Sequence, residues 1–281
     1  MSFSEQELIN SKVEYDSSFE NKKEGYISLK DISLKYTQGA GSIEALRDVN
    51  LELQDNEFIC VLGPSGCGKS SLLNIIAGYI KPSTGSVIVD GKTHTKPDPE
   101  VGVVFQQPNL FPWLNIEKNI EFGLKMKKVS KYKRREITKH YLQMVELETS
   151  SKLLPHQLSG GMKQRATIAR TLAADPKIIL LDEPFSALDA LTREKMQNHL
   201  HSIWKKTQKC LFFITHDVDE ALLLGKRIII MHPNPGRIIK DFINPLSKFK
   251  SDSFRLLRST KEFSEMREYL IDQIQNEEAV K

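Results

Sequence analysis

Residues 63–70 have the types and the spacing that a phosphate-binding loop needs. The segment reads Gly63-Pro64-Ser65-Gly66-Cys67-Gly68-Lys69-Ser70 and matches the pattern G-x-x-x-x-G-K-[ST]. Glycines let the backbone wrap and aim its N–H groups at phosphate oxygens, and the helix that follows adds its positive end. Lys69 would place its charge on the β- and γ-phosphates, and Ser70 would offer a hydroxyl to Mg²⁺. The loop, together with Ser71, is therefore predicted to bind a nucleoside triphosphate.

Two carboxylates follow a short apolar run further along the chain. Residues 178–181 are all Ile or Leu, and Asp182 and Glu183 come next. Acids at the C-terminal end of a buried strand lie where open α/β sheets bind ligands. Asp182 is expected to hold the metal through water, and Glu183 to polarise the attacking water. Without the phosphate-binding loop, this pattern would be a weak signal.

Strands and helices alternate around these motifs. Residues 27–36 predict two short strands or one bulged strand, because Asp31 breaks the alternation of apolar and polar residues. Residues 70–79 and most of 113–175 have helical patterns. Six further segments have the texture of strands: 49–53, 58–62, 86–89, 178–181, 211–214 and 227–231. The prediction is an α/β fold with a mainly parallel sheet covered on both faces and a helical insert.

Composition excludes several classes of protein. Of the 281 residues, 40% are hydrophobic and 27% are charged, which is typical of a globular protein with a sizeable core. No apolar run approaches the roughly 18–20 residues that span a bilayer, and the polar start does not resemble a secretory signal. The net charge of +4 is too small to indicate a nucleic-acid partner. The three scattered cysteines, Cys60, Cys67 and Cys210, predict neither disulfides nor a zinc site and favour a reducing cytosol.

Residues 158–165, Leu-Ser-Gly-Gly-Met-Lys-Gln-Arg, resemble the signature motif of ATP-binding-cassette (ABC) ATPases. GTPases, small-molecule kinases and recombinases lack this motif, and the chain has no Asn-Lys-x-Asp guanine reader. Residues 104–106 resemble the family's Q-loop, 186–189 its D-loop and 214–217 its switch-histidine region. The resemblance spans about residues 27–240. It implies a P-loop NTPase core with a mostly parallel sheet, an antiparallel β subdomain and a helical insert.

The resemblance also implies an assembly with a second copy of the chain. In the family, the turn that corresponds to Ser159, Gly160 and Gly161 binds the γ-phosphate of ATP held by the other subunit. Small residues before a helix suit this role, because they expose backbone N–H groups to an anion. Two ATP molecules are then sandwiched between two head-to-tail subunits, so ATP-driven dimerisation is expected.

The family resemblance also implies a role for individual residues of the other motifs. His216 would contact the γ-phosphate, and Gln106 would touch the metal or the attacking water. Tyr36 stands where the family places an aromatic residue that stacks on adenine, although an ordinary tyrosine at a strand end is the alternative. The predicted catalytic residues are Glu183, His216, Gln106 and Lys69, and the predicted Mg²⁺ ligands are Ser70, Gln106 and Asp182.

Two further features allow expectations of their own. Cys67 lies near Lys69 and a helix N-terminus, so the pKa of its thiol is expected to be lowered and its alkylation to be blocked by ATP. Residues 125–139 hold eight Lys or Arg and one acid. This stretch predicts either a surface for nucleic acid or lipid, or a solvated helix face, and the second is favoured because aromatic residues are not regularly interleaved.

The domain organisation follows from these patterns. Residues 1–25 are predicted to form a polar N-terminal extension, and 26–245 the ABC ATPase domain, with a helical subdomain at about 107–165. Residues 246–281 are predicted to form a helical tail. Within it, Phe263, Met266, Leu270 and Ile274 have the spacing of an amphipathic helix.

Segments 105–113, 182–193 and 215–221 look like those of the nitrate, sulfonate and taurine importers. That group more often has Gly where Ser186 stands, and it also serves bicarbonate and pyrimidine thiamine precursors. The likeness implies an ATPase on the cytoplasmic face of the membrane that drives uptake of a small anion through separate permease subunits. A periplasmic or lipid-anchored binding protein would deliver the substrate, and no nucleic acid is expected. Phe111 and Trp113 lie where the family contacts the permease, with core packing as the alternative.

Two other functions compete with import. An exporter ATPase is disfavoured by the importer-like segments. An ABC protein that acts on DNA or ribosomes is disfavoured because such proteins usually carry two cassettes or long coiled coils. Because Glu183 and His216 are both present, a catalytically inactive switch is also disfavoured.

Overall fold

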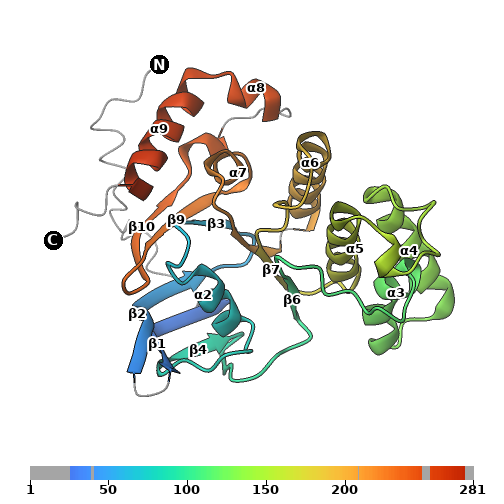
Figure 1. Cartoon of the computed structure of the whole chain (residues 1–281), viewed down its shortest axis with the longest axis horizontal. Coiled ribbons are helices and arrows are strands. Elements are labelled where there is room, and N and C mark those ends of the chain that lie inside the picture. The colour runs from blue at the N-terminus through green and yellow to red at the C-terminus, as the bar shows by residue number, and fades with distance from the viewer. Residues whose placement is uncertain (1–25, 39–40, 208, 249–253, 276–281) are drawn as a thin grey trace. The chain divides into compact units, whose positions relative to one another are not determined.

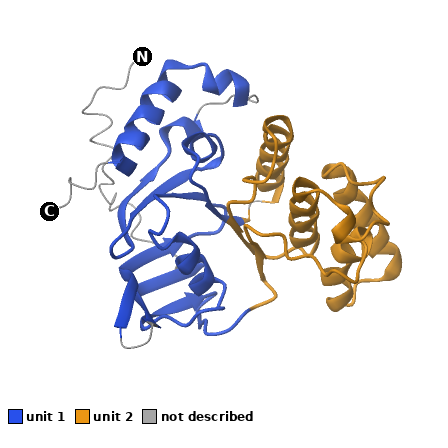
Figure 2. Ribbon diagram, viewed as in Figure 1, with its two compact units in different colours: residues 1–97, 210–281 blue, residues 98–209 orange. Residues whose placement is uncertain are grey.

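The computed structural model describes residues 26–38, 41–207, 209–248 and 254–275. The predicted polar extension at 1–25 lies outside these residues. The chain divides into two compact units, which are coloured separately in Figure 2. Unit 1 comprises described residues of 1–97 and 210–281, and unit 2 comprises those of 98–209.

The first sheet of unit 1 is antiparallel. Its strand order is β2-β1-β4-β5, with β1 at Ile27–Gln38, β2 at Gly41–Leu53, β4 at Thr84–Val89 and β5 at Lys92–Thr93 (Figure 1). β1 is one bulged strand, because its register with β2 shifts between Leu29 and Ile32 and Asp31 has φ +52°. This antiparallel sheet is the β subdomain that the family resemblance implied.

The second sheet of unit 1 is built around β3 (Phe58–Leu62), of which every residue is buried. β3 pairs in parallel with β8 (Cys210–Ile214) on one side and β9 (Arg227–His232) on the other. β10 (Arg237–Ile243) adds an antiparallel edge to β9 and was not predicted. Continuous apolar runs made the inner strands recognisable, whereas the burial of β10 is mixed.

Helices of unit 1 follow these strands. α2 (Lys69–Ile76) comes after β3, and α7 (Val218–Leu224) after β8. The tail holds the short 3₁₀ helix η3 (Pro245–Lys248), then α8 (Phe254–Arg258) and α9 (Lys261–Gln275). The predicted amphipathic helix is confirmed, since α9 buries Phe263, Met266 and Leu270. It packs against α7 and β9 (Figure 1).

Unit 2 combines a pair of strands with helices. β6 (Val101–Val104) and β7 (Ile178–Asp182) run parallel. The predicted helical stretch contains α3 (Ile116–Met126), α4 (Lys131–Met144), the 3₁₀ helix η2 (Pro155–Gln157) and α5 (Gly160–Ala173). α6 (Ala190–Thr207) follows β7. α3 packs on both α4 and α5, so these three helices form the insert.

Across the described residues, no helix combines the length and the apolar character that crossing a bilayer requires.

Candidate functional site

The phosphate-binding loop of unit 1 connects β3 to α2, as the motif requires. Lys69 is only 7% exposed, and its ammonium group donates hydrogen bonds to the carbonyl oxygens of Gly63 at 2.7 Å and Pro64 at 3.0 Å. The Lys69 side chain thus folds back onto the backbone at the start of the loop. Because α2 begins at Lys69, the first N–H groups of α2 have no partner within the helix. The loop therefore offers a cation and backbone donors to an anion.

Two glycines of the loop cannot be replaced without a clash. A Cβ at Gly63 would lie 2.3 Å from the Met231 carbonyl oxygen. Gly68 has φ +90°, and its Cβ would lie 2.6 Å from Leu46. Neighbouring segments therefore enforce the close backbone path around the loop.

Tyr36 is placed beside the start of α2. Its hydroxyl lies 3.2 Å from the Ser71 hydroxyl, and the side chain is 38% exposed at the end of β1. The structure thus brings Tyr36 into contact with Ser71, directly after the phosphate-binding loop and 35 residues away in sequence. An exposed ring at this position can stack on a planar base.

The expectation for the pKa of Cys67 was wrong. Cys67 is fully buried, and its sulfur lies 3.7 Å from the Lys69 ammonium. Burial raises the pKa of the Cys67 thiol, although the charge and hydrogen bonds of Lys69 act to lower it. Desolvation outweighs the nearby charge here, so the thiol is less reactive than the sequence suggested.

His216 lies between β8 and α7 and is exposed. The residues beside it are fixed. The Thr215 hydroxyl donates to the Glu220 carboxylate at 2.7 Å, and both residues are buried. Asp217 caps α7 by accepting from the backbone N–H of Asp219 at 2.8 Å. The exposed imidazole of His216 therefore lies between two residues that are held by hydrogen bonds.

In unit 2, two predicted catalytic residues are in direct contact. Gln106 Nε2 donates to Glu183 Oε2 at 3.0 Å. Gln106 follows β6, and Glu183 follows β7, directly after Asp182 at the end of the strand. The backbone at Glu183 has φ +44°, a conformation that a non-glycine residue adopts only at some cost.

The signature turn opens α5. Ser159 caps this helix by accepting from the backbone N–H of Met162 at 3.3 Å, and a Cβ at Gly160 would meet no described atom within 4 Å. Ser159 and Gly160 are exposed, and Gly161 is half-buried. The turn thus presents an open helix N-terminus, which suits an anion.

Sequence reasoning missed one residue that shapes this unit. Asn119 is fully buried in α3, where its side chain accepts from Phe111 N–H at 2.8 Å and donates to three carbonyl oxygens, including that of Phe111 at 3.2 Å. Phe111 packs on Phe122 with ring centroids 4.5 Å apart, whereas Trp113 is 72% exposed. The feature of the sequence that could have revealed Asn119 is an amide side chain on the apolar face of a predicted helix.

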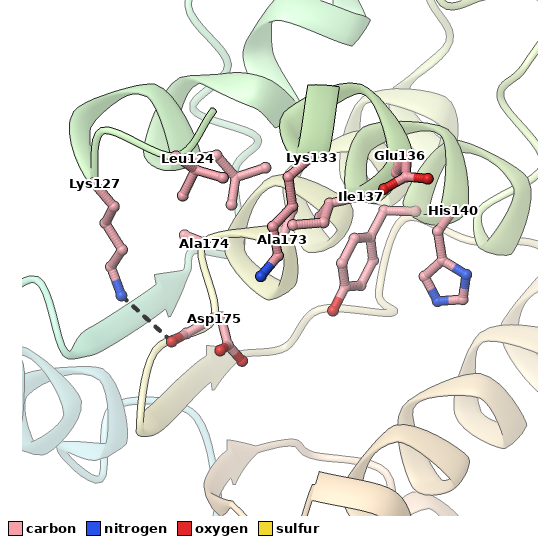
Figure 3. A pocket seen from close by; sticks show the side chains of 11 residues that line it. Leu124, Lys127, Lys133, Glu136, Ile137, His140, Ala173, Ala174 and Asp175 are labelled. Atoms are coloured by element: carbon pink, nitrogen blue, oxygen red, sulfur yellow. Dashed lines mark hydrogen bonds between the residues drawn. The ribbon is translucent and has the colours of Figure 1, made fainter. Parts of the chain in front are cut away.

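A separate pocket of about 510 Å³ lies among α3, α4 and the end of α5 (Figure 3). None of the described residues that line it belongs to the predicted nucleotide site. Lys127 on its rim pairs with Glu100 at 3.3 Å, and Asp175 pairs with Lys209. Burial, followed by the charge of Asp175, raises the pKa of Tyr141. Lys133 and Glu136 also line the pocket, so its walls carry charges of both signs.

The basic stretch at 125–139 lies mainly on α4 and the end of α3. Arg134 pairs with Glu121 at 2.7 Å, while most of the other cations are exposed.

The model of the ABC transporter family matches residues 46–186. This chain belongs to the ABC transporter family. Taurine import ATP-binding protein TauB of Roseobacter denitrificans is 45% identical over 88% of this chain and 93% of that protein. TauB of Pelagibacter ubique is 46% identical over 84% of this chain and 90% of that protein.

Solved structures of ABC cassettes are similar in sequence and fold. A dimeric cassette in a post-hydrolysis state, bound to ADP and Pi, is 37% identical with a TM-score of 0.71, and covers 77% of this chain and 98% of that chain. A second dimeric structure, of a bacterial ABC transporter cassette, is 38% identical with a TM-score of 0.72 and the same coverage. The predicted fold class is thereby confirmed, and the chain is an ATP-binding ABC ATPase.

Proposed function

We propose that the chain is the ATP-hydrolysing subunit of an importer for taurine or a related small anion, such as an aliphatic sulfonate or nitrate. The main support is that four relatives named as taurine import ATP-binding proteins are 42–46% identical to it. They match over 84–88% of this chain.

Unit 1 is proposed to bind the nucleotide. Lys69 would exchange its two carbonyl partners in the loop for the β- and γ-phosphates, and the backbone of residues 63–71 would cradle them. Tyr36 would stack on adenine, a contact worth roughly 1–3 kcal/mol by analogy with base stacking on aromatic side chains. His216 would donate a hydrogen bond to the γ-phosphate.

Unit 2 is proposed to supply the residues that activate the attacking water. Glu183 would take a proton from the attacking water as its oxygen bonds to the γ-phosphorus and the bond to the bridging oxygen of ADP breaks. The hydrogen bond from Gln106 would hold the carboxylate in one orientation while this occurs. Positioning of this kind supplies most of the catalysis in phosphoryl transfer.

Mg²⁺ is proposed as the metal that neutralises the phosphate charge. The hydroxyl of Ser70, the amide oxygen of Gln106 and the carboxylate of Asp182 are oxygen donors, which this ion prefers. Within the described residues, no cluster of three or more His, Cys, Asp or Glu could hold a metal. Mg²⁺ is usually held by one or two protein groups together with the phosphates of its substrate.

The partners in this proposal are a second copy of the chain and integral membrane permease subunits. The open turn at Ser159 and Gly160 would bind the γ-phosphate of ATP held by the second copy. Exposed Trp113, beside the packed ring of Phe111, would contact the permease on the cytoplasmic face of the membrane. A periplasmic or lipid-anchored binding protein would supply the substrate.

Uptake in cells tests the proposal. Glu183→Gln is placed at the native locus, with Glu148→Gln at an exposed position of unit 2 as the matched control. Uptake of taurine, alkanesulfonates, nitrate, bicarbonate and a pyrimidine precursor of thiamine is then measured. Loss of taurine or sulfonate uptake in Glu183→Gln alone is expected. If uptake of a different compound is lost, that compound is the substrate instead. Unchanged uptake of all five compounds would contradict the proposed import function.

A further inference from the structure

The C-terminal helix α9 reaches the segment that carries His216. Arg267 Nε donates to Asp219 Oδ1 at 2.8 Å, and α9 packs against α7. Asp219 lies in the first turn of α7, three residues after His216. The two bonded residues are 48 positions apart in sequence. No step in the proposed hydrolysis uses this contact.

Movement of the first turn of α7 would be passed to His216. Asp217, next to the histidine, is bonded to the backbone N–H of Asp219 at 2.8 Å and of Glu220 at 3.3 Å. Its own N–H donates to the Thr215 hydroxyl at 3.0 Å. Both neighbours of His216 are therefore tied to the start of α7.

α9 is also held by elements other than α7. Its apolar face, formed by Phe263, Met266 and Leu270, is buried. The Lys240 ammonium of β10 donates to the Tyr269 hydroxyl at 2.8 Å, and the buried ring of His232 at the end of β9 lies 3.0 Å from the Gln273 carbonyl oxygen. β9 and β10 thus fix the helix, and Arg267 extends to α7 from a firm support.

We propose that Arg267 is a positioning residue for ATP hydrolysis, which acts through Asp219 to hold His216 where it meets the γ-phosphate. This inference rests on the proposed role of His216. The Arg267 side chain is 50% exposed, so the ion pair contributes little to stability. Hydrolysis, in contrast, is sensitive to the position of the reacting groups, since a misplacement of about 1 Å can cost roughly a hundredfold in rate. Loss of Arg267 therefore affects the rate more than the stability.

Steady-state ATPase assays and thermal unfolding of the full chain test the inference. Arg267→Ala is expected to lower kcat by about fivefold, well below the roughly hundredfold cost of a 1 Å misplacement, because the packing of α9 on α7 still limits the displacement. The KM for ATP and the Tm are expected to stay near the parental values. Arg255→Ala removes an exposed arginine of α8 and serves as the matched control, with parental kcat. Equal kcat values for the two variants would overturn the inference.

A double-variant cycle checks that the ion pair is the route. Asp219→Ala removes the acceptor and is expected to lower kcat as Arg267→Ala does, and the double variant is expected to be no slower than either single variant. Losses that multiply in the double variant would contradict a shared route. Arg267→Lys keeps the charge and is expected to recover part of the rate, which also provides a test if Arg267→Ala folds poorly.

His216→Ala separates failure of this inference from failure of the proposed function. If His216→Ala hydrolyses ATP at the parental rate, the proposed role of His216 is wrong, and so is the positioning role of Arg267. If His216→Ala is slow but Arg267→Ala matches Arg255→Ala, only the positioning role is wrong. In single-turnover assays, adding Arg267→Ala to His216→Ala is expected to cause no further loss.

Discussion

Gln106 and Glu183 are joined by a 3.0 Å hydrogen bond across 77 residues of sequence. The register of two strands explains the contact. Val104 of β6 pairs with Leu181 of β7. Gln106 lies two residues after Val104 and Glu183 lies two residues after Leu181, so the two residues lie side by side. Parallel pairing therefore delivers an amide donor to the carboxylate that is proposed to activate water.

Replacing Glu183 by Gln is expected to lower ATP hydrolysis by about 10²–10⁴, the usual contribution of a general base. The amide is close in size to the carboxylate but cannot take the proton from water. ATP should then remain bound and hold two copies together. Size-exclusion chromatography with saturating ATP is expected to show a dimer of the variant. A variant that stays monomeric, or that hydrolyses at the parental rate, would contradict the role of Glu183.

Replacing Tyr36 distinguishes stacking from a purely structural tyrosine. Tyr36→Phe loses the contact with the Ser71 hydroxyl but keeps the exposed ring. Tyr36→Ala loses both, and ATP affinity is expected to fall by about tenfold or more, in line with the energy of base–aromatic stacking. Titration with ATP measures both variants. Equal losses for Phe and Ala would argue against stacking.

Alkylation of Cys67 is expected to be slow at neutral pH and to quicken with rising pH. Burial raises the pKa of this thiol, so the thiolate is scarce below that pKa and increases by about tenfold per pH unit. Peptide mass spectrometry after timed alkylation gives the rate at Cys67 separately from Cys60 and Cys210. Unfolding the chain in denaturant should accelerate labelling. If Cys67 is labelled faster at pH 7 in the folded chain than in the unfolded chain, the pKa of its thiol is lowered by folding instead.

Arg227 is expected to contribute strongly to stability. Its guanidinium group bonds to both carboxylate oxygens of Asp241 at 2.6 and 2.5 Å, to Glu57 at 3.1 Å and to the Glu52 carbonyl oxygen at 2.8 Å. Its side chain is 16% exposed. Arg227→Ala would leave two carboxylates without their cation, at a cost of about 3–5 kcal/mol in the free energy of unfolding.

Chemical denaturation measures this effect, with Arg255→Ala as the exposed control. A loss no larger than that of the control would show that solvent can replace the cation between Glu57 and Asp241.

Several parts of the fold could be predicted because they depend on neighbouring residues alone. A buried strand such as β3 is a continuous apolar run, and the helical pattern of α9 follows from its spacing. β6 escaped prediction because it has only four residues, including Gly102. A Cβ at Gly102 would lie 2.7 Å from Pro176, a constraint that only packing reveals.

The sequence by itself determined the phosphate-binding loop and the α/β class, because the loop is one contiguous motif and the class follows from the alternation of strand and helix patterns along the chain. The signature turn was predicted from its resemblance to the ABC family. Only the tertiary structure decided that the Cys67 pKa is raised and that Arg267 reaches Asp219. It also decided that Asn119 fastens the backbone of Phe111. Desolvation and hydrogen bonding depend on which atoms surround a side chain, and most of those atoms come from residues distant in sequence.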